Sequence, residues 1–149
     1  MDVNEAEVTL RQLGSSIGTS QARVEVGTSG ISPHNHAYLK LHSAIDPDRY
    51  AVISTPGDRW FELEVAGGYG AIEASELTPD SEARAILGRL LLMAAAYLDG
   101  RWAVKKSRLV GVPVLVLDTE AGEVKLRLSA KESIRKLFFR EPARRNLPG

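Results

Sequence analysis

Two of the three histidines in this chain stand two residues apart, in the segment His34-Asn35-His36. Imidazole nitrogens bind zinc, so two histidines on one side of a strand are a candidate metal site. If residues 34–42 form one strand, all three histidines lie on its polar face, with His34 and His36 about 6.6 Å apart and His42 about 20 Å from His36. The pair lacks a third ligand. We therefore predict a solvated face and no metal site, and leave open whether the pair has another role.

No other segment carries a catalytic motif. His-Asn-His also spells the name of a nuclease family, but there the three residues lie on separate parts of a hairpin–helix unit around one metal ion. Consecutive strand residues point to opposite faces. The glycine-rich AGGYGA lacks the Gly-Lys-Ser/Thr ending of a phosphate loop, and no serine stands in a nucleophile elbow. We predict no enzyme activity, no catalytic residue and no cofactor.

A group of acidic residues is the first candidate binding surface. Glu62, Glu64 and Glu73 come from neighbouring predicted strands. Carboxylates act in acid–base catalysis only where a cleft shifts their pKa, and the sequence indicates no cleft. Trp60 on the same face is either an anchor for a protein partner or is covered by the N-terminal helix. We take Trp60, Glu62, Glu64 and Glu73 as candidate partner-binding residues that project together.

A basic segment is the alternative partner-binding surface, with Lys105, Lys106 and Arg108 close together. The segment lacks interleaved aromatic residues and a recognition-helix pattern, so nucleic acid is not the expected partner. The charge is also divided along the chain. Residues 1–75 carry a net charge of −5 and residues 76–149 carry +5. This predicts either surfaces of opposite sign or attraction between the two halves within one fold.

Periodicity predicts the elements that position these residues. Seven segments are predicted to be strands, at 22–26, 36–43, 49–55, 59–65, 71–75, 113–118 and 123–129. Apolar and polar residues alternate most clearly at 22–26, 36–43 and 59–65. Short Gly/Pro turns between them favour an antiparallel meander. Helices are predicted near the N-terminus, ending at Gly14, and over 79–98, with Thr78 as N-cap. A Ser-x-x-Glu capping box at 129–132 opens a third helix.

The predicted fold is a single α+β domain over residues 1–149, with an antiparallel sheet packed against one long helix. A hairpin followed by a helix occurs twice, at about 59–98 and 113–139, and about 140–149 is predicted to be a frayed tail. The chain has no cysteine, which excludes disulfides and thiolate sites. It has no apolar run of the roughly 18 residues that a membrane helix needs and no signal-peptide core. We expect a cytoplasmic protein that does not bind membranes.

Several marks between residues 46 and 118 resemble a known family. They are Asp48-Arg49-Tyr50 at the start of a strand, Tyr97 late in the long helix, and the series Arg108, Gly111, Pro113 and Leu115. Together they resemble the immunity proteins of actinobacterial polymorphic toxins, in particular the tuberculosis-necrotizing-toxin immunity-factor type. The resemblance implies a small cytosolic α+β protein that binds a cognate toxin, in that type an NAD-hydrolysing one, and blocks its active site. It assigns no toxin-contacting residue.

Two other classes of function stay open. A secretion accessory or chaperone-like protein that holds an unfolded segment is the alternative, and a small enzyme of unknown class that uses a carboxylate or a histidine is the third. The sequence leaves the oligomeric state and the identity of the toxin undecided.

Overall fold

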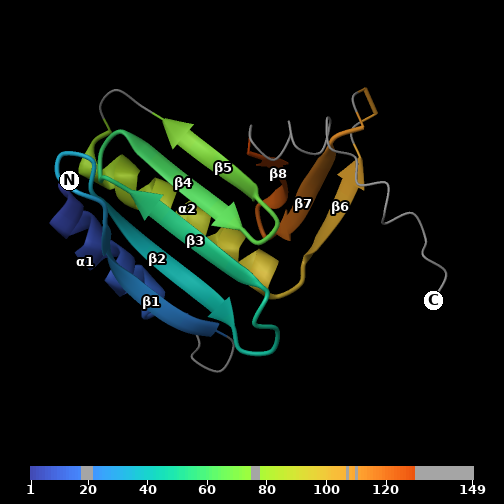
Figure 1. The fold of residues 1–149 in the computed structure, drawn as a ribbon, viewed down its shortest axis with the longest axis horizontal. Helices are drawn as coiled ribbons and strands as arrows, with labels where there is room; N and C mark the ends of the chain where they lie inside the picture. The colour runs from blue at the N-terminus through green and yellow to red at the C-terminus, as the bar shows by residue number, and fades with distance from the viewer. Residues whose placement is uncertain (18–21, 75–77, 107, 110, 130–149) are drawn as a thin grey trace.

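One antiparallel sheet of eight strands forms the framework of the molecule. The structure is a computed structural model, and it describes residues 1–17, 22–74, 78–106, 108–109 and 111–129. The elements in chain order are α1 (Val3–Gly14), β1 (Ala22–Ser29), β2 (His36–Ser43), β3 (Tyr50–Thr55), β4 (Trp60–Val65), β5 (Tyr69–Ala74), α2 (Asp80–Leu98), β6 (Trp102–Lys106), β7 (Pro113–Thr119) and β8 (Gly122–Leu128). The strand order is β1-β2-β3-β4-β5-β8-β7-β6 (Figure 1). These elements confirm the predicted α+β class.

The two helices cover the same face of the sheet. α2 packs on β3, β4 and β7, and α1 packs on β1 and β2; Figure 1 shows α2 behind β3 and β4. We call this side the helix face and the opposite side the outer face. Two helices thus cover the sheet face for which the sequence analysis predicted one long helix.

The strand β4 shows how the sequence sets the two faces. Phe61, Leu63 and Val65 are fully buried on the helix face, while the residues between them lie on the outer face, because strand side chains alternate. Leu90 of α2 is also buried in this core. Such burial of apolar surface contributes about 25 cal/mol per Å² and is the main stabilising term of the fold.

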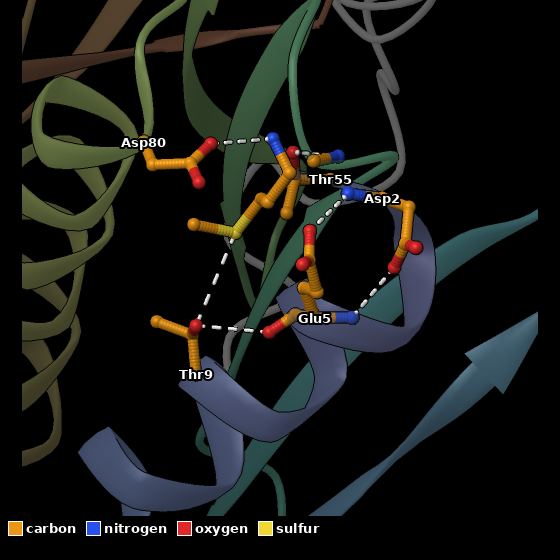
Figure 2. Close-up of polar contacts among 7 residues, drawn as sticks. Asp2, Glu5, Thr9, Thr55 and Asp80 are labelled. Atoms are coloured by element: carbon orange, nitrogen blue, oxygen red, sulfur yellow. Dashed lines mark hydrogen bonds and ion pairs between the residues drawn. The ribbon is translucent and has the colours of Figure 1, made fainter.

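The N-terminus fixes α1 beside the start of α2. Asp2 caps α1 in a reciprocal capping box with Glu5 (Figure 2). The α-ammonium group of Met1 donates to the Asp80 carboxylate at 2.8 Å. The prediction of Thr78 as N-cap is wrong: Pro79 occupies that position and makes no side-chain cap bond. The ion pair to Asp80 ties the first turn of α2 to the N-terminus instead.

The strand β6 was missed by the sequence prediction, which treated its lysines only as surface. It completes a second meander, β6-β7-β8, that joins the first through β5 and β8. This junction is narrow, since the pairs among the described residues are Tyr69 with Leu128 and Gly70 with Arg127. The first predicted hairpin–helix unit is confirmed by β4, β5 and α2. The helix and the frayed tail predicted after residue 129 lie outside the described residues.

Candidate partner-binding face

An acidic patch with an aromatic residue lies on the outer face of β4. Trp60, Glu62 and Glu64 alternate with the buried residues of the strand, and Glu64 is exposed. The His36 ring of β2 lies 5.8 Å from the Trp60 ring, centroid to centroid. α1 packs on the opposite face, so it does not cover Trp60, and that alternative is wrong. We call Trp60, Glu62 and Glu64 the acidic patch.

Glu73 does not belong to the acidic patch, contrary to the prediction. It pairs with Phe61 across the β4–β5 hairpin, and directly paired residues share a face. Its side chain therefore points to the helix face, where Arg89 of α2 donates to both carboxylate oxygens at 3.2 and 2.9 Å. The residue ties the end of β5 to α2, and Ile72 takes the place beside Glu62 on the outer face.

The surroundings of Glu62 disfavour the charged form of its carboxyl group. Burial raises its pKa above the ordinary value, the neighbouring Glu64 charge raises it further, and His36 opposes both effects. A carboxylate that is partly desolvated and close to a like charge gains from a cation brought by a partner. The patch therefore favours a basic group opposite Glu62 and Glu64.

The histidines are divided between a loop and a strand. β2 begins at His36, so His34 lies in the preceding turn, where its backbone N–H donates to Ile31 at 2.8 Å. The prediction of one polar face with all three histidines is therefore wrong. Within the described ranges, no three His, Asp or Glu side chains converge in a way that could hold a metal ion.

A groove beside the second meander is lined by cations. Its volume is about 610 Å³. Its apolar lining residues are Val112, Pro113, Val114, Val116 and Leu128, and its charged lining residues are Lys105, Lys106, Arg108, Lys125 and Arg127. We call it the basic groove. Lys105 and Arg127 both pair with Val114 and lie on the outer face, whereas Lys106 pairs with Pro113 and lies on the helix face. No Asp or Glu within 4 Å pairs with any of these cations in the part of the chain that the structure describes.

A second groove connects the basic groove to the acidic patch. Its volume is about 540 Å³, and it lies over the junction of β5 and β8. Glu62 and Glu64 line one side, and Lys125 and Arg127 line the other. Ile72, 67% exposed, lies between them on β5. Lys125 and Arg127 also line the basic groove, so the two grooves share these cations, and acids and cations lie on opposite sides of the junction.

Sequence reasoning missed the residues that connect the two surfaces. Lys125 and Arg127 alternate with buried Leu126 and Leu128 in β8, so their orientation was readable from the alternation. Their position beside β5 was not readable, because it depends on a pairing between residues that are 57 and 59 positions apart, Gly70 with Arg127 and Tyr69 with Leu128. Without that pairing, the position of one charged surface relative to the other could not be predicted.

Two residues of the family resemblance, Arg49 and Tyr97, lie in an aromatic cluster around Trp102. The Arg49 guanidinium lies over the Trp102 ring at 5.9 Å, and Tyr97 stacks on the same ring at 5.3 Å. Arg49 also donates to the backbone carbonyl of Leu98 at 3.4 Å. This cluster joins the β2–β3 loop, the end of α2 and β6. It positions the second meander and does not line either groove.

Comparisons with family models, with curated proteins and with solved structures give no significant match to this chain. Neither of the two described helices combines the length and the apolar character that crossing a bilayer requires.

Proposed function

We propose that this protein is a cytoplasmic immunity protein, which binds a cognate toxin through its outer face and blocks the toxin's active site. The observation that carries the proposal is the acidic patch, where Trp60 and two glutamates that form no ion pair with any described residue lie beside exposed Ile72, on a sheet face that neither described helix covers. Aromatic side chains at the centre of an interface contribute most of its binding energy, and charges around them set the rate of association. The family resemblance points to the same class.

Inhibition follows from steric occlusion, so the protein needs no chemistry of its own. A toxin that acts on a small substrate is blocked when a rigid sheet face covers the mouth of its active site. The acidic patch fits a site rimmed by Lys or Arg, and the basic groove fits an acidic element next to it. An interface with both signs also discriminates against toxins that match only one of them.

The proposal is tested by producing the protein together with the toxin domain encoded beside its gene. We expect the two to copurify at equal stoichiometry and the protein to abolish the toxicity of that domain in cells. The Glu62→Lys/Glu64→Lys variant should lose both properties, whereas a control with Asp48→Lys and Glu120→Lys, two exposed acids outside the grooves, should keep them. Retained protection by the patch variant would place the interface elsewhere.

The chaperone-like alternative makes a different prediction for the same proteins. A chaperone holds an extended segment, so it should bind an unfolded fragment of its client and leave the folded domain unbound. An immunity protein should bind only the folded toxin. Comparing binding to the native and to the urea-unfolded toxin domain, after rapid dilution of the urea, separates the two classes.

A further inference from the structure

The two edges of the sheet differ in how they are protected. At one edge, β6 has five residues and ends in Lys105 and Lys106, and such charges on a short strand discourage pairing with another chain. At the other edge, β1 is eight residues long, pairs with β2 along its whole length and contains no proline. No described strand pairs with the edge of β1 that points away from β2. An open, regular edge of this length is a site for strand addition.

The sequence of β1 is complementary to itself when read in the antiparallel direction. With Val24 placed opposite Val24 of a second copy, Arg23 faces Glu25 and Ala22 faces Val26. Arg23 and Glu25 are exposed on the outer face, and Val24 and Val26 are half-buried on the helix face. Each outer-face pair then joins opposite charges and each helix-face pair joins apolar side chains, as stable cross-strand pairs do.

We propose that β1 is a dimerisation edge, at which two copies of this chain pair their β1 strands antiparallel about a two-fold axis through Val24. A two-fold interface requires a self-complementary surface, and the Arg23–Val24–Glu25 series meets this requirement. The resulting sheet continues through both copies. The acidic patch on β4 lies three strands away from this edge, so the dimer leaves both patches accessible. The inference is independent of the proposed function.

The test measures mass in solution by sedimentation velocity at high micromolar concentration. The parent protein should have twice the 16.2 kDa mass of one chain. Arg23→Glu and Glu25→Arg each place like charges opposite each other at two symmetry-related positions. Each should raise the dissociation constant by about tenfold or more. An Arg84→Glu control, on the exposed side of α2, should dimerise like the parent.

Mixing the two weakened variants provides the decisive test of the proposed pairing. Arg23→Glu paired with Glu25→Arg restores opposite charges at both positions, so the mixture should dimerise again although neither variant does alone. A folding defect could not be repaired in this way. A monomeric parent protein, a dimer that both variants leave intact, or a mixture that stays monomeric would each overturn the proposal.

Discussion

The two faces of β4 differ in burial and in the kind of residue that they carry. On the helix face, Phe61, Leu63 and Val65 have no exposed surface and pack against α2. On the outer face of the same six residues, the acidic patch has a half-buried tryptophan and two glutamates without cationic partners among the described side chains. The difference teaches that a single alternation of apolar and polar residues can specify both a core and the surface that we propose binds the partner.

The largest expected effect on stability comes from a substitution on the helix face. Leu63→Ala should lower the free energy of unfolding by about 2–5 kcal/mol, because a fully buried leucine loses transfer energy and leaves a cavity. Its neighbour Glu64→Ala should change it by less than about 0.5 kcal/mol, because exposed substitutions rarely matter. Urea unfolding of both variants makes the comparison. Equal destabilisation by the two would mean that the faces are not separated as described.

Removing the ion pair at the N-terminus should have a smaller effect that depends on pH. The hydrogen bond to Asp80 raises the pKa of the Met1 ammonium above 8.0, and the same bond lowers the pKa of Asp80 below 3.8. The pair thus stabilises the fold fully between these values. Its contribution is lost as the pH rises through the raised amine pKa or falls through the lowered carboxyl pKa.

Asp80→Asn should therefore lower the melting temperature most between about pH 4 and pH 8. The difference from the parent should narrow on either side of this range. Differential scanning calorimetry across the pH range measures it. A difference that stays constant into the alkaline range would mean that the Met1 ammonium is not the partner that matters.

Glu62 gives the smallest stability effect, of opposite sign. Because burial raises the pKa of folded Glu62 above 4.5, the folded state binds this proton more readily than the unfolded state. The charged residue therefore lowers stability at neutral pH, and this cost disappears as the pH falls through the raised pKa towards 4.5. Glu62→Gln should raise the melting temperature slightly at neutral pH and leave it unchanged below pH 4.5. A variant that melts below the parent at neutral pH would contradict this account.

Much of the framework could be predicted because its signals are local. The alternation in β4 and the long apolar side of α2, with its stop at Asp99-Gly100, need no knowledge of the rest of the chain. β6 was missed because Trp102–Lys106 is short and charged, which makes a protected edge strand look like a loop.

The face of Glu73 was predicted wrongly because the sequence does not give the register of the β4–β5 hairpin. In a hairpin the register decides the face, and here it places Glu73 opposite Phe61. A glutamate is tolerated on the helix face because it lies at the end of the strand, where Arg89 reaches it. The joining of acidic and basic surfaces likewise required the β5–β8 pairing, a contact that no local pattern encodes.

The central claim, that the acidic patch binds a protein partner, is tested most directly by association kinetics. The purified toxin domain encoded beside the gene is immobilised, and the parent, Glu62→Lys/Glu64→Lys and Asp48→Lys/Glu120→Lys proteins are compared at low and moderate salt. The account predicts that only the patch variant associates more slowly, by about tenfold or more at low salt, with a difference that shrinks as salt screens the charges. Association and dissociation rates equal to those of the parent, in a patch variant with an unchanged melting temperature, would contradict it.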